Sequence, residues 1–261
     1  MRHLRRIVRL PLLLIHVTIG VVVIALAVLL DRLLGKRLHH GLARRMQAFW
    51  CRSICRLMGV RMQLSGQAMA APPVLLVANH LSWLDILVVA ANWKVSFLSK
   101  SEVRSWPGIG LVATGLGTLY IERGQRDASG NAMRAMAQRL REGHRVLFFP
   151  EGTTSPGNNL LPFRPRLFQA AIDAGVPVQP ITIRYLEAND EPNAVAPFVD
   201  DEGLLSHVMR LSAEPGMRAV LEVGEPVDSR GRGRNELALL CREQMAEALN
   251  PSEPHEEQAA G

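Results

Sequence analysis

A histidine and an aspartate stand five residues apart, directly after an apolar stretch, in the segment VANHLSWLD (77–85). On a continuous helix, five residues at about 100° each would leave His80 and Asp85 roughly 140° apart and out of contact. They meet only if the chain turns between them, where a strand ends and a helix begins near Ser82. An aspartate that accepts one imidazole N–H leaves the other ring nitrogen as a base. Taken alone, the spacing also fits a surface histidine at an ordinary strand-to-helix turn.

Two more apolar stretches end in polar residues. The segment FFPEGTTS (148–155) places Glu151 and Gly152 after one of them, and GTLYIERG (117–124) places Arg123 after the other. A glycine lets the backbone approach a ligand closely, and its N–H can hold an anionic oxygen. The alternatives are an ordinary turn and a solvated arginine. Because open α/β sheets place their active sites at the carboxyl ends of strands, the three segments together predict a site with a base, an acidic glycine turn and a cation.

Strands and helices alternate from about residue 62 onward. Strands are expected at 73–78, 95–98, 118–121, 146–149, 178–183 and 220–223, and helices at 129–141, 165–174 and 236–249. This alternation predicts an α/β fold with a mostly parallel central sheet flanked by helices.

The N-terminal region has the features of a membrane anchor. Leu10 to Leu30 is an uncharged, apolar run, and a helix needs about 20 residues to cross a ~30 Å hydrocarbon core. The charged residues that follow offer no signal-peptide cleavage site. We therefore expect a membrane-embedded helix, either as a single span or as a segment that returns to the same face. Residues 41–60 carry an apolar stripe, which predicts an amphipathic helix in the membrane interface or one packed on the catalytic domain.

Charge and composition limit the partners. The 261 residues are 48% hydrophobic and carry a formal net charge of +6. The surplus cations precede residue 60, beside the apolar run, which indicates anionic membrane lipids rather than nucleic acid as the partner. We divide the chain into a membrane anchor with the interfacial helix (1–60), a catalytic domain (61–249) and a disordered acidic tail (250–261).

Cysteines and histidines give no sign of metal or thiol chemistry. Cys51, Cys55 and Cys241 form no C-x-x-C pair, which is typical of structural thiols in a reducing compartment. The eight histidines show no recurrent ligand spacing, so we expect no metal site.

The polar segments resemble the motifs of a known family, the 1-acylglycerol-3-phosphate O-acyltransferases (lysophosphatidic acid acyltransferases) and related glycerolipid acyltransferases. The resemblance covers about residues 72–185, and the motifs occur in the family's order. The first motif, Asn-His followed by four residues and Asp, matches Asn79 to Asp85, and the second, an apolar strand ending in Arg, resembles Gly117 to Arg123. The third motif, Phe-Pro-Glu-Gly-Thr, is Phe149 to Thr153, and the fourth resembles Val176 to Ile183 around Pro180. Lys100 in FLSKSEV matches a lysine that the family has between the first two motifs.

Two positions depart from the family pattern. Leu81 stands where many members have glutamine. Thr154 stands where phosphatidate-forming members usually have an arginine associated with the acceptor's phosphate. The departure at Thr154 leaves room for a different acceptor head group.

The resemblance implies an O-acyltransferase that moves a fatty acyl group from acyl-CoA or acyl carrier protein (acyl-ACP) to the free hydroxyl of a lysolipid. The thioester is a co-substrate, and no other cofactor is implied. His80 would act as general base, oriented by Asp85. The implied substrate-binding residues are Asn79, Lys100, Arg123, Glu151, Gly152 and Thr153, with Arg123 nearest an anionic head group. The chain lacks a G-x-S-x-G elbow, which agrees with direct attack without an acyl-enzyme; Ser82 as nucleophile is the rival within the motif.

The acceptor expected first is 1-acylglycerol-3-phosphate, which would give phosphatidate. The alternatives are the same chemistry on a lyso-ornithine lipid or another lysolipid, a lipid or thioester hydrolase, and a membrane-anchored scaffold with a degenerate site. We expect the protein at the inner membrane, with its catalytic domain on the cytoplasmic face.

Overall fold

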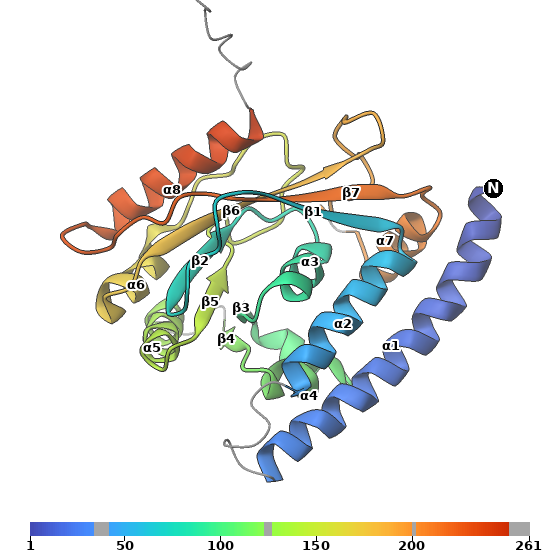
Figure 1. The fold of residues 1–261 in the computed structure, drawn as a ribbon, viewed down its shortest axis with the longest axis horizontal. Helices are drawn as coiled ribbons and strands as arrows, with labels where there is room; N and C mark the ends of the chain where they lie inside the picture. Colours follow the sequence, from blue (N-terminus) through green and yellow to red (C-terminus); the bar gives the residue numbers. More distant parts are fainter. Residues whose placement is uncertain (34–41, 123–126, 200–201, 251–261) are drawn as a thin grey trace, which may run out of the picture.

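The computed structural model describes residues 1–33, 42–122, 127–199 and 202–250. Its α-helices are α1 (Arg2–Leu33), α2 (Leu42–Leu57), α3 (Leu84–Asn92), α4 (Ile109–Gly115), α5 (Ala128–Arg141), α6 (Gln169–Ala174), α7 (Leu204–Ser212) and α8 (Arg234–Leu249), with 3₁₀ helices η1 (Ser101–Ser105) and η2 (Pro165–Phe168). Its strands are β1 (Val60–Gly66), β2 (Val74–Ala78), β3 (Ser96–Lys100), β4 (Leu119–Ile121), β5 (Arg145–Phe148), β6 (Val178–Leu186) and β7 (Met217–Val223). Figure 1 shows their arrangement.

The seven strands form one sheet in the order β1-β7-β6-β2-β5-β3-β4. Near the middle, β2 runs parallel to both β5 and β6. Among these strands, the pair β6–β7 is antiparallel. The predicted α/β fold with a mostly parallel sheet is confirmed. The helix expected at 165–174 is instead the 3₁₀ helix η2 followed by α6.

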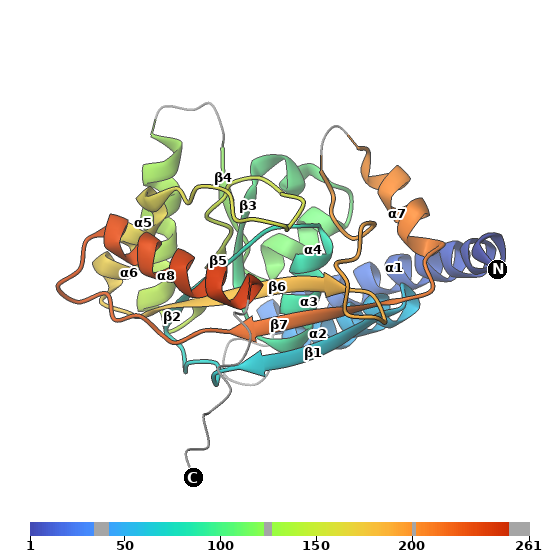
Figure 2. The ribbon, with the colours of Figure 1, turned by 90° about the horizontal axis from the view of Figure 1, so that it is seen from above.

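Strand β2 is buried on both faces, as a central parallel strand must be. Its alternate residues Leu75 and Val77 pack in a core with α5, α6 and α8. The intervening Leu76 and Ala78 pack in a second core with α2 and α3. Helices therefore cover both faces of the sheet (Figure 2).

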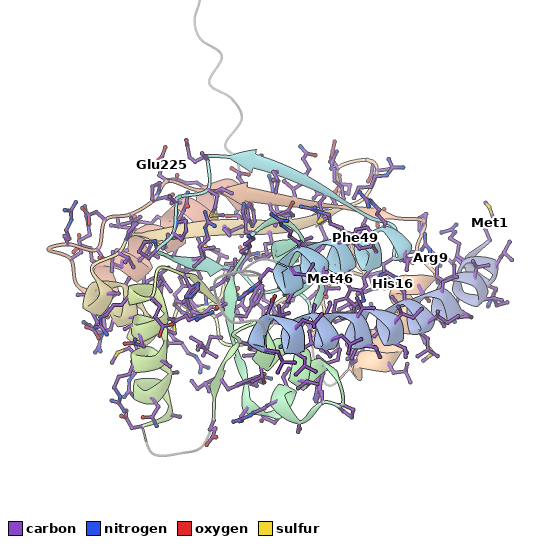
Figure 3. The ribbon with its side chains drawn as sticks, turned by 60° about the horizontal axis from the view of Figure 1, so that its bottom comes forward. Met1, Arg9, His16, Met46, Phe49 and Glu225 are labelled. Carbon is purple, nitrogen blue, oxygen red and sulfur yellow. The ribbon has the colours of Figure 1, made fainter. Side chains whose placement is uncertain are left out.

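The N-terminal helix α1 is long and apolar enough to cross a membrane. It runs along one flank of the molecule beside α2 (Figure 3). Its inner side packs closely: a Cβ on Gly20 would overlap the ring of Trp50, and Val21 and Val28 lie against the backbone of α4 and the residue before it. Its outer side exposes a series of large apolar residues along its length, so it forms an apolar face of the molecule.

Helix α2 packs on the catalytic domain. Ile54 of the predicted apolar stripe lies in the core beside α3, together with Cys51 and Cys55, whereas Phe49 of that stripe is exposed. Arg44, which lies off the apolar stripe, enters the protein and donates to the carbonyl oxygens of Val95 and Leu116. Burial lowers the pKa of Arg44 to about 10. The acidic tail from residue 251 onward lies outside the described residues.

Candidate active site

His80 and Asp85 meet at the carboxyl end of β2. The chain turns after Ala78, and α3 begins at Leu84, so five residues that would diverge on a helix bring their side chains together. The imidazole Nδ1 lies 2.7 Å from Asp85 Oδ2. The predicted contact is confirmed. With Nδ1–H donated to the carboxylate, Nε2 is the nitrogen with a free lone pair.

The carboxylate of Asp85 is fully buried and accepts four hydrogen bonds. Oδ2 accepts from the backbone N–H groups of Leu81 at 2.7 Å and Ser82 at 2.9 Å as well as from His80. Oδ1 accepts from the hydroxyl of Tyr185 at 2.8 Å. Burial, followed by the charge of Asp85, holds the pKa of Tyr185 well above its ordinary value, so this hydroxyl keeps its proton and donates. These bonds hold the carboxylate where it orients the imidazole.

Ser82 is not positioned as a nucleophile. Its side chain is fully buried and its backbone N–H belongs to the turn around Asp85. The hydroxyl has no hydrogen-bond partner among the described residues. A serine nucleophile needs an adjacent base and access to substrate, and neither is provided here.

The loop after β5 supports His80 from the other side. The ring of Phe149 stacks on the imidazole at 3.9 Å between centroids and 12° between planes. Glu151, buried, accepts from the backbone N–H groups of His80 at 2.9 Å and Leu161 at 3.0 Å. Burial raises the pKa of Glu151, against the opposing effect of these bonds. Ser155 donates its N–H to the His80 carbonyl at 2.8 Å, so both sides of the histidine backbone are held.

Asn79 extends the strand pairing by one residue. Its amide donates to the Ile183 carbonyl at 2.9 Å and accepts from the Ile183 N–H at 2.7 Å. The side chain thus replaces a backbone link between β2 and β6 and fixes the position from which His80 departs. Substrate binding by Asn79 stays a prediction.

The remaining predicted substrate residues differ in placement. Gly152 has a left-handed φ of +73°, a conformation that favours glycine, and its N–H donates to the Phe149 carbonyl at 3.1 Å. Thr153 is exposed on the same loop, and Lys100 is exposed at the end of β3. Arg123 lies outside the described residues. The substrate roles of these four residues stay predictions.

Sequence reasoning missed an arginine beside this loop. The backbone N–H of Arg164 donates to the Pro150 carbonyl at 2.9 Å. Its guanidinium lies against Gly152: a Cβ built there would be 3.1 Å from Cζ and Nε of Arg164. The glycine turn therefore carries a cation, supplied from outside the recognised motifs, that can attract an anionic group.

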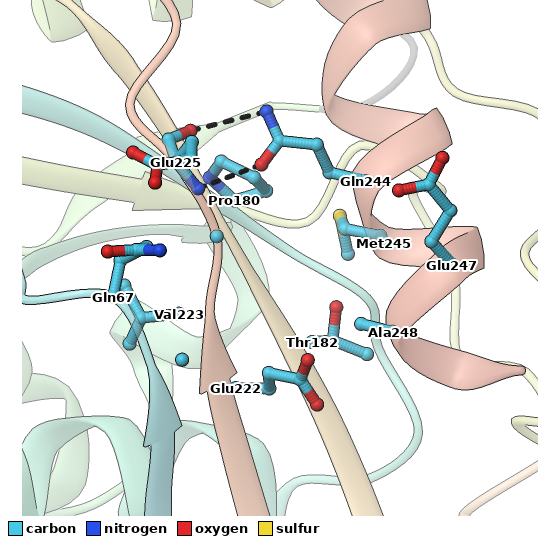
Figure 4. Close-up of a pocket in the computed structure, with 12 residues that line it drawn as sticks. Gln67, Pro180, Thr182, Glu222, Val223, Glu225, Gln244, Met245, Glu247 and Ala248 are labelled. Atoms are coloured by element: carbon cyan, nitrogen blue, oxygen red, sulfur yellow. Dashed lines mark hydrogen bonds between the residues drawn. The ribbon is translucent and has the colours of Figure 1, made fainter. Parts of the chain in front are cut away.

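A separate groove lies at the opposite edge of the sheet, where β2 begins. It has a volume of about 520 Å³ and is lined by the carboxyl ends of β1 and β7, the start of β6 and one side of α8. In this groove, Gln244 is hydrogen-bonded to both the N–H and the carbonyl of Glu225 (Figure 4). No group of three or more metal-ligating side chains occurs within the described ranges. We therefore place the candidate active site at His80, not at the groove.

Comparisons with known proteins identify the family. A model of the Acyltransferase family matches residues 60–184. The chain is 39% identical to a lyso-ornithine lipid O-acyltransferase of Pseudomonas aeruginosa over 95% of both chains. It is 41% identical to a 1-acyl-sn-glycerol-3-phosphate acyltransferase of Neisseria gonorrhoeae over 53% of this chain and 54% of that protein.

A solved structure shares the fold. The crystal structure of PlsC, the 1-acyl-sn-glycerophosphate acyltransferase of Thermotoga maritima, superimposes with a TM-score of 0.72 and 23% identity, covering 96% of this chain and 97% of that one. The sequence motifs, the fold and the full-length relative agree. The chain is an acyltransferase and belongs to the 1-acylglycerol-3-phosphate O-acyltransferase family of glycerolipid acyltransferases.

Proposed function

We propose that the protein transfers a fatty acyl group from a thioester to the free hydroxyl of a lyso-ornithine lipid. The observation that carries this acceptor is the 39% identity over 95% of both chains with a protein named for that activity. Thr154 supports it, because phosphatidate-forming members usually have an arginine there. The acceptor expected first from the sequence, 1-acylglycerol-3-phosphate, becomes the second candidate.

The chemistry follows from the imidazole–carboxylate pair. The acceptor hydroxyl oxygen attacks the thioester carbonyl carbon while its proton passes to Nε2 of His80. The C–S bond then breaks, an ester C–O bond remains, and the proton passes from the imidazolium to the departing thiolate. Asp85 stabilises the imidazolium through the 2.7 Å contact with Nδ1. No acyl-enzyme is required, which is consistent with the burial of Ser82.

The setting of the site supports a membrane-borne acceptor. The apolar outer side of α1 would hold the domain at a bilayer, where a lysolipid already resides. We place the domain on the cytoplasmic face of the inner membrane, where acyl-CoA and acyl-ACP are available as donors.

Phosphatidate formation is kept as a second candidate because of the Neisseria gonorrhoeae relative. Arg164 beside Gly152 could bind a phosphate as well as it could bind the carboxylate of an ornithine head group. The two acceptors therefore have to be compared directly.

The test offers purified protein a panel of acceptors with one labelled acyl donor, supplied either as acyl-CoA or as acyl-ACP. We expect mass spectrometry to find diacylated ornithine lipid as the main product, and thiol release to depend on the acceptor. A higher kcat/KM for 1-acylglycerol-3-phosphate would overturn the acceptor assignment. Thiol release without acceptor would indicate a hydrolase.

A matched variant sharpens the acceptor test. Thr154→Arg restores the residue usual in phosphatidate-forming members, at a half-buried position on the loop that supports His80. We expect the ratio of kcat/KM values to shift towards 1-acylglycerol-3-phosphate. An unchanged ratio would show that position 154 does not select the head group.

A further inference from the structure

Helix α7 presents apolar residues to the outside and a polar residue to the core. Leu204, Leu205 and Met209 are exposed, Leu205 at 71%, whereas His207 is completely buried. An ordinary surface helix of a globular domain has the opposite arrangement. An apolar exposed side of this kind marks a surface that meets another apolar phase.

This helix is attached to the N-terminal helix. Arg6 Nε donates to the Met209 carbonyl at 3.1 Å, and Arg9 Nη1 donates to the carbonyls of Ser212 at 3.3 Å and Glu214 at 2.6 Å. Arginines at the carboxyl end of a helix donate hydrogen bonds to its last carbonyl groups and interact favourably with the helix dipole. The exposed side of α7 is therefore continuous with α1, whose outer side is apolar along its length.

Helices α4 and α7 both flank α1 on the side of the catalytic edge, as Figure 2 shows. Trp106, just before α4, and Leu111 within it are also exposed. A bilayer lying against α1 would thus meet apolar side chains on both neighbouring helices, with an aromatic residue at one of them, as at membrane interfaces. A bilayer is the occupant that this continuity favours.

The buried side of α7 reaches the catalytic turn. His207 Nδ1 accepts a hydrogen bond from Trp83 Nε1 at 2.8 Å, and its Nε2 lies 3.0 Å and 3.1 Å from the carbonyls of Val195 and Pro197. This pattern requires a neutral ring protonated at Nε2, and burial lowers the pKa of His207 accordingly. Trp83 lies between His80 and Asp85 in the chain.

A second link runs parallel to the first. The N–H of Phe198, in the segment held by His207, donates to the Leu81 carbonyl at 2.7 Å. Leu81 in turn donates its own N–H to Asp85. A displacement of α7 would therefore shift Leu81 and Trp83, two residues of the turn that carries the base.

We propose that α7 is a second lipid-contacting helix, and that its seating on the bilayer positions the His80–Asp85 turn through His207 and Trp83. This inference rests on the proposed function for its activity measurement but not for its binding measurement. Trp83 and His207 are positioning residues, since both act through the turn.

The binding measurement uses a fluorescent label. The three native cysteines are buried, and burial raises the pKa of each to about 12, so they compete poorly for a thiol-reactive probe. Leu205→Cys is labelled with an environment-sensitive fluorophore, and Leu239→Cys, 53% exposed on α8, is the matched control.

On adding vesicles of mixed anionic and zwitterionic phospholipids, we expect a blue shift and brightening at position 205 and no change at position 239. Equal responses at the two positions, or none at position 205, would overturn the lipid contact. A response at position 205 that follows protein concentration without vesicles would assign the surface to a second copy of the chain, and would also overturn it.

The activity measurement separates contact from coupling. Leu205→Ser should lower kcat/KM for vesicle-borne acceptor several-fold and leave activity on a soluble short-chain lysolipid unchanged, with Leu239→Ser changing neither. Trp83→Phe removes the donor to His207 while keeping an aromatic ring. It should reduce the ratio of vesicle to soluble activity while the label at position 205 still responds.

An unchanged ratio in Trp83→Phe would overturn the coupling. If neither acceptor form is acylated by the unaltered protein, the proposed function fails, but the fluorescence result still decides whether α7 contacts lipid.

Discussion

The two edges of the central sheet differ in how their polar groups are used. At the carboxyl edge of β2, the hydrogen bonds of Asp85, Tyr185 and Glu151 converge on His80, whose side chain remains 19% exposed. At the opposite edge, Gln244 in the groove bonds to the backbone N–H and carbonyl of Glu225. Gln179, which precedes the groove residue Pro180, likewise bonds to the backbone of Ala70, Ala68 and Gly224 around one end of β6.

This difference shows why the groove is not the better candidate for catalysis. A base needs an oriented ring with one unoccupied nitrogen, and this requires buried partners around an accessible atom. Amide side chains that stabilise loops supply neither a base nor a nucleophile. At the end of β2 the hydrogen bonds hold a histidine side chain, whereas at the groove they hold loop backbone. Variants at the two edges can test whether only the first of these sites is catalytic.

Removing the base should have the largest effect. His80→Ala leaves the turn and its carboxylate but no group to accept the hydroxyl proton, so we expect kcat to fall by about 10² to 10⁴-fold. Steady-state kinetics with a saturating acceptor measure this, and circular dichroism controls for folding. Acyl transfer at near-normal rates by the folded variant would show that His80 is not the base and that this edge is not the catalytic one.

Removing the orienting charge should have the next largest effect. Asp85→Asn keeps the size of the side chain but cannot accept from all four donors that now surround the carboxylate. The imidazole remains but loses its fixed orientation, so we expect a loss of about 10 to 10²-fold in kcat. A larger loss than in His80→Ala would mean that Asp85 acts on the reaction by some other route.

The motif-bearing half of this site could be predicted from sequence. An apolar run followed by polar residues identified the ends of β2 and β5, and the need for a turn gave the contact between His80 and Asp85. Both depend on local order along the chain, which short-range patterns report.

The supporting half could not be predicted, because it comes from distant segments. Tyr185 is 100 residues from Asp85; its strand was expected to end at Ile183, although the alternation of Ile181, Ile183 and Tyr185 continues the buried face. Helix α7 was missed for a different reason. Leu204 and Leu205 are exposed while His207 and Leu211 are buried, so the apolar residues of this helix do not form one buried stripe that the sequence pattern could show.

A smaller effect is expected at Tyr185, the distant residue that bonds to Asp85. Tyr185→Phe removes one hydrogen bond to the Asp85 carboxylate and leaves three. Hydrogen bonds to charged groups contribute roughly 1.5–3 kcal/mol, so we expect a stability loss of about that size. Activity should fall only a few-fold, because the imidazole contact persists. Urea unfolding in detergent and kinetics on the same preparation measure both, and full stability would show that Tyr185 does not support Asp85.

The smallest effect is expected at the opposite edge. Ala248 is a half-buried residue of the groove wall near the end of α8 (Figure 4), so Ala248→Trp partly fills the groove without touching the catalytic turn. If the groove has no part in acyl transfer, kcat and the KM values for donor and acceptor should stay unchanged. A raised KM for the acyl donor would show that substrate occupies the groove, and the contrast between the two edges would then fail. Because His80→Ala is expected to act on kcat alone, the two variants also distinguish loss of chemistry from loss of binding.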